Sequence, residues 1–274
     1  MTEAARTGTP RVLNDPFARL EGPLAGTTRM RLRVERNDLL TPAMQEVVLS
    51  APELADFTYR PGQDLMLMVD VDGDRPVRRR YTIRAVDQAG RQVTLGIVRH
   101  DDGPGERWVQ AARPGDQIEG IGPRGKIFPS AGADWHLFAG DFSALPAFFA
   151  MAGSLPAQAQ ATVILEVPGR DDEQELTSEA TASTLWLYRE DRPAGDPSAL
   201  AAALADVPLP PGTGHAYLAG EARLVLALRE ALAARGMPAD RVSPKAYWGL
   251  GKANAPHGEP PREDAASPGE RPPA

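Results

Sequence analysis

The sequence predicts two domains in series, a six-stranded antiparallel β-barrel followed by an α/β domain with a parallel sheet. In the first half, short segments alternate polar with apolar residues, and turn pairs such as Pro61-Gly62 and Pro114-Gly115 separate them. Short strands at this spacing are typical of a small antiparallel barrel. From about residue 130, apolar strands alternate with helical segments, which is typical of a parallel sheet covered on both faces.

The strands of the barrel are identified by their alternation. In the first of them, Met30, Leu32 and Val34 fall on one face and three arginines fall on the other. The six predicted strands are residues 28–34, 46–49, 65–71, 80–86, 92–99 and 116–122.

The α/β domain is predicted from apolar runs and from helical spacing. Strands are expected at residues 136–139, 161–167, 184–188, 215–219 and 242–248, and helices at residues 143–152, 197–204 and 221–235. In the last of these helices, the apolar residues at 224, 225, 228 and 232 form one face.

Composition divides the chain into four segments. Residues 1–26 are predicted to be an irregular lead-in, residues 27–130 the barrel domain and residues 131–255 the α/β domain. Residues 256–274 are rich in proline and almost free of apolar side chains. Such a segment does not repay the entropy of ordering, so the tail is predicted to be disordered.

The composition also excludes several classes of protein. The 274 residues include no cysteine, which excludes disulfides, thiolate metal sites and cysteine catalysis. The net charge of −7 argues against a protein that coats nucleic acid. No apolar run reaches membrane-spanning length and the first ten residues lack a signal-peptide layout, so a cytoplasmic protein is expected. The four histidines are scattered, and no protein metal ligands are expected.

The segment RRRYTIR at residues 78–84 is the first candidate site. Alternation places Arg80, Thr82 and Arg84 on one face of a strand, and Tyr81 and Ile83 on the other. Guanidinium groups can bind phosphates through paired hydrogen bonds, and tyrosine is a flat partner for a ring system. A basic, solvated edge strand that resists aggregation has the same pattern, and spacing alone favours neither reading.

Further candidate segments lie where strands meet helices. Residues 100–108, HDDGPGERW, form a glycine-rich loop before a helix start, which can present backbone N–H groups to a phosphate but is also an ordinary connection. Residues 139–147, AGDFSALPA, and residues 219–221, AGE, each follow a strand. The sequence KAYWGLG at 245–251 ends the last strand, where the aromatic residues either join the core or cover a ring. No G-x-G-x-x-G fingerprint is present.

Taken in this order, the segments resemble the siderophore-interacting protein family, which are FAD-containing ferric-siderophore reductases of the ferredoxin–NADP reductase-like superfamily. The resemblance covers about residues 28–252 and rests on RRRYTIR, H-x-x-GPGERW, AGDFSALPA, the LAGE helix start and the terminal YW-x-x-G. It implies an FAD-binding barrel and an α/β domain that binds NADPH or NADH. It also implies a small-molecule substrate, a ferric siderophore whose Fe(III) is reduced through the flavin.

The resemblance assigns roles position by position. The FAD-contacting strand residues are Arg79, Arg80, Tyr81 and Thr82. The other implied cofactor-binding residues are His100, Gly103, Pro104, Gly105, Trp108, Ala144, Gly220, Glu221, Tyr247 and Trp248. The residues implied near the nicotinamide and flavin edge, where catalysis occurs, are Asp141, Phe142 and Ser143. The candidates for attracting an anionic ferric chelate are Lys245 and Lys252, with Arg79.

One departure from the family keeps other functions open. Phe142 stands where the family commonly has glutamate, which at a substrate-facing position would suit an apolar ligand, although simple drift explains it equally well. The alternatives are a family member recruited to natural-product biosynthesis, with FAD as a tailoring catalyst or scaffold, and a flavin-binding electron carrier. The nicotinamide preference is also open, since Glu166 would disfavour a 2′-phosphate and Arg170 would favour one.

Overall fold

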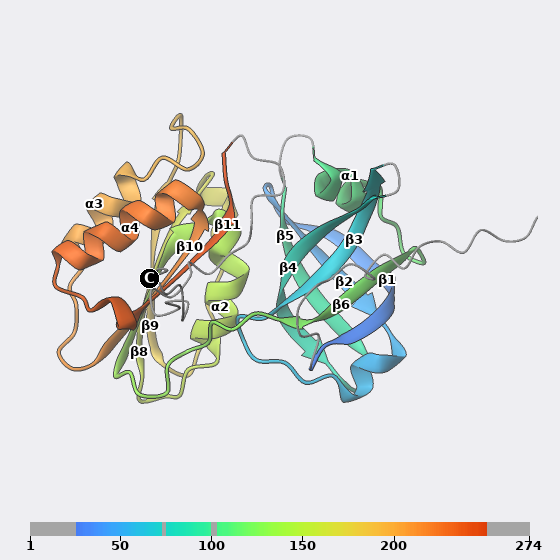
Figure 1. The fold of residues 1–274 in the computed structure, drawn as a ribbon, viewed down its shortest axis with the longest axis horizontal. Helices are drawn as coiled ribbons and strands as arrows, with labels where there is room; N and C mark the ends of the chain where they lie inside the picture. The colour runs from blue at the N-terminus through green and yellow to red at the C-terminus, as the bar shows by residue number, and fades with distance from the viewer. Residues whose placement is uncertain (1–25, 73–74, 100–102, 251–274) are drawn as a thin grey trace, which may run out of the picture.

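The computed structural model describes residues 26–72, 75–99 and 103–250, and the chain forms a barrel beside a layered α/β domain (Figure 1). The first six strands close into a barrel with the order β1-β2-β5-β4-β3-β6, and every neighbouring pair is antiparallel. The barrel strands are β1 (Thr28–Thr41), β2 (Met44–Ser50), β3 (Asp64–Asp72), β4 (Arg75–Asp87), β5 (Gln92–Val98) and β6 (Gln117–Arg124). The predicted six-stranded barrel is therefore confirmed.

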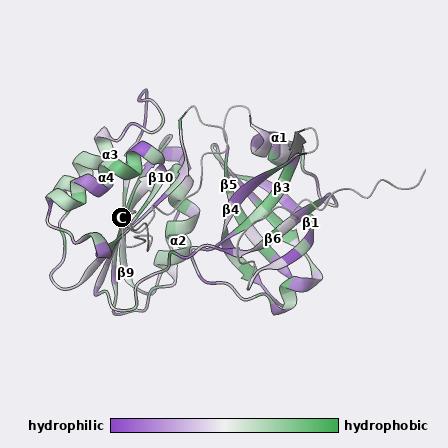
Figure 2. Cartoon of the chain, in the orientation of Figure 1, coloured by the Kyte–Doolittle hydropathy of each residue, from purple (hydrophilic) through white to green (hydrophobic). Residues whose placement is uncertain are grey.

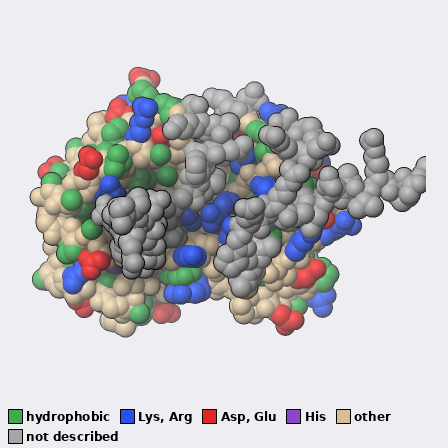
Figure 3. Space-filling model, viewed as in Figure 1, with side chains coloured by type: hydrophobic (Ala, Val, Ile, Leu, Met, Phe, Trp, Pro, Cys, Tyr) green, Lys and Arg blue, Asp and Glu red, His purple; other side chains and the backbone are tan. Residues whose placement is uncertain are grey.

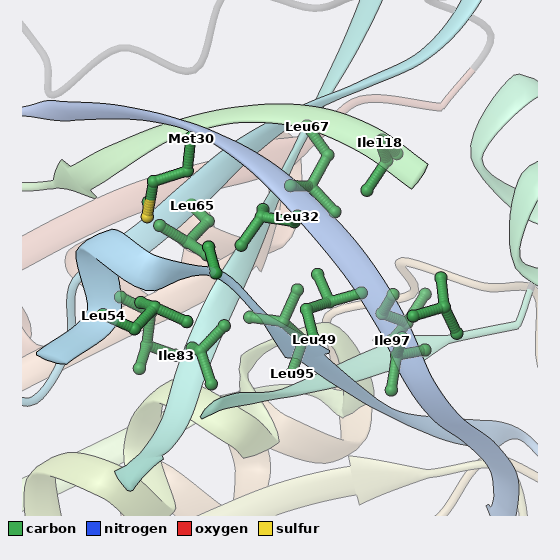
Figure 4. Close-up of a cluster of buried hydrophobic side chains, with 14 of the residues drawn as sticks. Met30, Leu32, Leu49, Leu54, Leu65, Leu67, Ile83, Leu95, Ile97 and Ile118 are labelled. Atoms are coloured by element: carbon green, nitrogen blue, oxygen red, sulfur yellow. The ribbon is translucent and has the colours of Figure 1, made fainter. Parts of the chain in front are cut away.

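The interior of the barrel is filled by the apolar face of each strand. Leu32, Leu65, Ile83 and Leu95 are fully buried and point toward one another from four different strands (Figure 4). Burying one such side chain contributes about 1.5–3 kcal/mol, which makes this face the main source of the barrel's stability. The short helix α1 (Pro104–Ala111) packs Val109 into the same cluster.

The second domain is a five-stranded parallel sheet with the order β11-β10-β7-β8-β9. Its strands are β7 (Trp135–Asp141), β8 (Gln160–Val167), β9 (Thr181–Tyr188), β10 (Gly214–Glu221) and β11 (Val242–Trp248). The chain winds from β7 outward to β9 and then returns to place β10 on the other side of β7. The carboxyl ends of β7 and β10 therefore form the switch point at which such sheets bind ligands.

Helices cover both faces of this sheet. On one face lies α2 (Leu145–Gly153), between the sheet and the barrel, and on the other lie α3 (Ser198–Asp206) and α4 (Ala222–Ala234) (Figure 1). Along β7 the alternation sends Phe138 to the α2 face and Leu137 to the α3 and α4 face. Helix α2 is apolar along its length because it is covered on two sides, whereas α4 carries hydrophilic bands toward solvent (Figure 2).

The two domains share a packed interface. Met44 of β2 belongs to the same buried cluster as Phe148 of α2. The Thr41 hydroxyl and the Ala43 N–H, both on the barrel side, donate to Asp172 Oδ1 at 2.8 and 2.9 Å. Asp172 ends a short 3₁₀ turn, η3 (Arg170–Asp172), that follows β8.

The structure adds details that periodicity did not indicate. Strand β1 runs seven residues beyond its predicted end, to Thr41, since its pairing with β2 continues through two bulges. The helix after β7 begins with a 3₁₀ turn, η2 (Phe142–Ala144), and two further 3₁₀ turns are η1 (Pro52–Asp56) and η4 (Ala239–Arg241). The predicted lead-in and proline-rich tail lie outside the described residues. Among the helices described, none has the length and hydropathy needed to cross a membrane.

Candidate functional site

The candidate site lies where β4 of the barrel meets the carboxyl ends of β7, β10 and β11. Ile83 points into the barrel, so alternation turns Arg80 and Thr82 outward, toward the α/β domain. The phenol of Tyr247 on β11 lies beside Thr82: burial raises the pKa of Tyr247, and the Thr82 side chain opposes the increase. The two segments predicted to surround a ring are therefore in direct contact.

The first turn of α1 lies against the arginine–tyrosine strand. Gly105 is required there, since a Cβ at this position would lie 2.5 Å from the Tyr81 hydroxyl oxygen and 3.4 Å from Cγ of Arg79. The first N–H groups of a helix have no partner within the helix and favour anions. The α1 N-terminus and the Arg79 guanidinium thus form a set of donors that fits the pyrophosphate of a dinucleotide such as FAD.

Tyr81 is held between the barrel and α1. Its ring stacks on that of Trp108, with centroids 6.2 Å apart and planes inclined by 25°. Burial raises the pKa of Tyr81, while Arg79 acts in the opposite direction and Glu106 adds to the increase. The phenol therefore stays neutral, which suits an aromatic contact with a ring.

Asp141 ties together three strands at the switch point. Its Oδ1 accepts from the Ser143 N–H at 2.9 Å and from the Ser143 hydroxyl at 2.5 Å. Its Oδ2 accepts from the Glu221 N–H at 2.7 Å and from the Trp248 indole N–H at 3.0 Å. Burial raises the pKa of Asp141, and these hydrogen bonds oppose the increase. In the described contacts Asp141 is a positioning residue, and its direct role in catalysis remains a prediction.

The two β10 residues that were predicted to lie on the nicotinamide side, Gly220 and Glu221, make contacts within the protein. Gly220 has a φ of +137°, and a Cβ on it would lie 2.5 Å from Oδ2 of Asp141, so only glycine fits beside that carboxylate. Glu221 caps α4, accepting from the N–H groups of Arg223 and Leu224. Its other oxygen accepts from the Leu250 N–H at 3.1 Å, so nucleotide binding by Glu221 stays a prediction.

Phe142 and Ala144 do not line an open surface. Phe142 is only 4% exposed and packs with Phe138 and Phe148 in the cluster between the sheet and the barrel. Ala144 is fully buried in the same cluster. The expectation that Phe142 faces the substrate is therefore not supported, because its 3₁₀ turn directs the ring into the core.

A cluster of charges joins β3, β4, β6 and β11. Arg80 donates to both oxygens of Asp64, Nε to Oδ1 at 2.7 Å and Nη2 to Oδ2 at 2.6 Å. The Lys245 ammonium lies 3.5 Å from Asp64 Oδ2. Arg124 lies opposite Asp64 in the strand register, and burial together with Arg80 lowers the pKa of its guanidinium. Lys245 is 8% exposed, so it is an interdomain ion-pair residue as well as a predicted substrate-binding residue.

The sequence interpretation missed Asp64, Arg124 and Asp172, which the structure places at the domain boundary. An acidic residue opening the otherwise apolar strand of residues 65–69 was the available signal for Asp64. His100 and Lys252 lie outside the described residues. Within the described ranges, no group of three or more histidine or acidic side chains is arranged to hold a metal ion.

Comparison with known proteins gives the family. Residues 66–127 match the model of the siderophore-interacting FAD-binding domain, and residues 133–251 match that of the siderophore-interacting protein. A siderophore utilization protein from T. fusca has a structure with a TM-score of 0.76 at 30% identity, covering 85% of this chain and 97% of that one. The chain belongs to the siderophore-interacting protein family. FAD is accordingly the cofactor of its barrel domain, in agreement with the donors around Arg79.

Two curated relatives of this siderophore-interacting protein have named activities. The ferric vibriobactin reductase ViuB of Vibrio cholerae is 35% identical over 182 residues, which are 65% of this chain and 66% of the relative. The NADPH-dependent ferric-chelate reductase of Escherichia coli is 26% identical over 239 residues, 79% of this chain and 90% of the relative. The chain spans 56% of the length of three mycobacterial relatives that are 39% identical to it.

Proposed function

We propose that this protein is a flavin-dependent ferric-siderophore reductase that takes its electrons from NADPH or NADH. The observation that carries the proposal is the contact between Thr82 on the flavin-binding strand and Tyr247 at the end of β11. This contact brings the flavin-binding strand to the switch point of the parallel sheet, where nucleotides bind. The named activities of the two curated relatives support the same reaction.

The cofactor supplies the redox chemistry, since a bound flavin takes up two electrons as a hydride and gives them up singly. The chain's part is to bind and to orient. Arg79 and the N-terminus of α1 would hold the pyrophosphate, and Tyr81 and Thr82 would contact the ring system. Asp141 fixes the Trp248 indole at the end of β11.

The electrons and protons of the proposed reaction balance, and the reaction needs no metal ligand from the protein. One NAD(P)H delivers two electrons to two ferric chelates, and one proton is released. Fe(III) prefers hard oxygen ligands more strongly than Fe(II) does, so the reduced iron leaves the chelator. The substrate is thus a small molecule that carries the iron.

The test uses the purified protein with bound FAD under anaerobic conditions. Absorbance is recorded before and after NADPH or NADH is added, and then with a ferric siderophore and an Fe(II)-specific chromogenic chelator. We expect bleaching of the flavin band and two Fe(II) for each NAD(P)H. A flavin that is bound but that neither coenzyme reduces would overturn the proposal and favour a scaffold or electron-carrier role.

A further inference from the structure

We propose that Asp64 tunes the charge preference of the substrate site: by offsetting part of the positive charge around it, it weakens the binding of highly anionic ferric chelates and leaves that of neutral ones nearly unchanged. The inference rests on the reductase function proposed above and concerns the net charge of the ferric chelate that the site binds. It comes from a single buried carboxylate that lies among cations at the boundary between the two domains.

The geometry of the cluster makes Asp64 its centre. The side chain is 4% exposed, both of its oxygens accept from Arg80, and Lys245 lies 3.5 Å away on the other domain. Lys and Arg side chains gather between the two halves of the molecule in the space-filling view (Figure 3). Because Asp64 binds two of the cations that surround it, it reduces the positive charge that this region offers to a ligand.

Asp64 also lies beside the residues expected to contact the flavin. In the strand register it is opposite Thr82 on β4 and opposite Arg124 on β6. Its field reaches the phenol of Tyr247, whose pKa is raised by burial first and by Asp64 second. A chelate that approaches the ring near Thr82 and Tyr247 therefore experiences the charge of Asp64.

The side chains of Arg80, Lys245 and Arg124 carry three positive charges, and Asp64 carries one negative charge. The net charge of the four is therefore +2. Neutralising Asp64 would raise it by one. For a trianionic chelate centred about 8 Å away in a water-like dielectric, one extra charge changes Kd by about tenfold. A neutral chelate has no net charge on which the added positive charge could act, so its Kd should change little.

The test measures binding of gallium(III) chelates to the FAD-loaded protein by isothermal titration calorimetry. Gallium(III) has the charge of Fe(III) but is not reduced, so binding is read without turnover. We expect Asp64→Asn to bind a trianionic tris-catecholate complex about tenfold more tightly and a neutral tris-hydroxamate complex within twofold of the wild type. High salt should reduce the difference. An unchanged preference, or an equal change for both complexes, would overturn the proposal.

Matched variants separate charge from geometry. Asp70→Asn makes the same change on the same strand, about 20 Å away along β3, and should leave both affinities unchanged. Lys245→Met should weaken trianion binding by about tenfold, and the double variant Asp64→Asn/Lys245→Met should regain the wild-type preference. If Asp64→Asn does not fold, Lys245→Met carries the test, and undiminished trianion binding by that variant overturns the proposal.

This experiment also distinguishes failure of the inference from failure of the proposed function. A wild-type protein that is reduced by NADPH but reduces no ferric chelate would contradict the reductase function. The gallium affinities would still report whether Asp64 sets the charge preference.

Discussion

Asp141 is a buried carboxylate whose four hydrogen bonds come from η2, β10 and β11. Burial raises its pKa above the ordinary value of 3.8 in spite of these bonds. The folded protein therefore holds the Asp141 proton more tightly than the unfolded chain does. By linkage, the contribution of Asp141 to the free energy of unfolding must fall as pH rises from 3.8 through the raised pKa, and must be constant above it.

We predict that the free energy of unfolding of the wild type, relative to that of Asp141→Asn, decreases as pH rises through this window. Asparagine cannot ionise, so the variant lacks this pH dependence. Urea unfolding of both proteins at stepped pH values measures the difference. A difference that is flat, or that increases with pH, would contradict the burial of an ionisable Asp141.

Phe142 gives a second prediction for a single residue. Its ring fills the cluster between sheet and barrel, so Phe142→Glu places a carboxylate among Phe138, Phe148 and Met44. We expect at least about 3 kcal/mol of destabilisation, from lost packing and from desolvation of the charge. Thermal unfolding measures it, with Phe142→Leu as the apolar control. A stable glutamate variant with faster flavin reduction would instead restore the substrate-facing interpretation.

For single residues, the sequence did not predict the direction in which each side chain points. The segments that contain Asp141, Ser143 and Tyr247 were predicted because each follows or ends a strand, and strand ends meet at the switch point. The resemblance to the family then assigned the individual residues. The side chain of Phe142 could not be oriented, because the 3₁₀ turn that directs it inward has no periodic signal. The partners of Lys245 were also unpredictable, since Asp64 is distant in sequence and belongs to the other domain.

At the scale of elements, the position of α1 against β4 depends on the smallest side chain. Gly105→Ala places a methyl group 2.5 Å from the Tyr81 hydroxyl oxygen and forces α1 away from Arg79 and Tyr81. Because the helix N-terminus and Arg79 would then no longer converge on one phosphate, we predict about tenfold weaker FAD binding. Fluorescence titration of the apoprotein with FAD measures this change.

Gly132→Ala is the control, because Gly132 lies in the loop before β7 and outside the α1 segment. A Cβ on Gly132 meets no atom within 4 Å. FAD binding by this variant should stay close to that of the wild type. Equal weakening by both variants would mean that the contact of Gly105 with Tyr81 does not determine the affinity.

Strand and helix positions were largely predictable at this scale, because alternation and helical spacing persist through most elements. Strand β11 was predicted with its observed ends, Val242 and Trp248, which are both large apolar residues. The extension of β1 to Thr41 was not predicted. Residues 38–40 are exposed, and the bulge between Val34 and Arg36 breaks the alternation.

At the scale of the whole molecule, function requires the barrel and the α/β domain to keep one relative position, because the flavin strand and the switch point lie on different domains. Asp172 is a contact that holds this position. It is 3% exposed and accepts hydrogen bonds from the barrel-side Thr41 hydroxyl and Ala43 N–H. Neither partner could be inferred from the sequence, since Asp172 follows Thr41 by 131 positions and Ala43 by 129.

We predict that Asp172→Ala leaves both barrel donors without their acceptor and destabilises the interface by about 1–3 kcal/mol. Because the lost bonds lie between domains, the single calorimetric transition expected for the wild type should broaden or split into two. Asp171→Ala is the control, since Asp171 is the exposed neighbour on the same 3₁₀ turn. If Asp172→Ala unfolds in one transition at the wild-type temperature, the domains are held by the apolar contacts of α2 with the barrel, and the hydrogen bonds to η3 are dispensable.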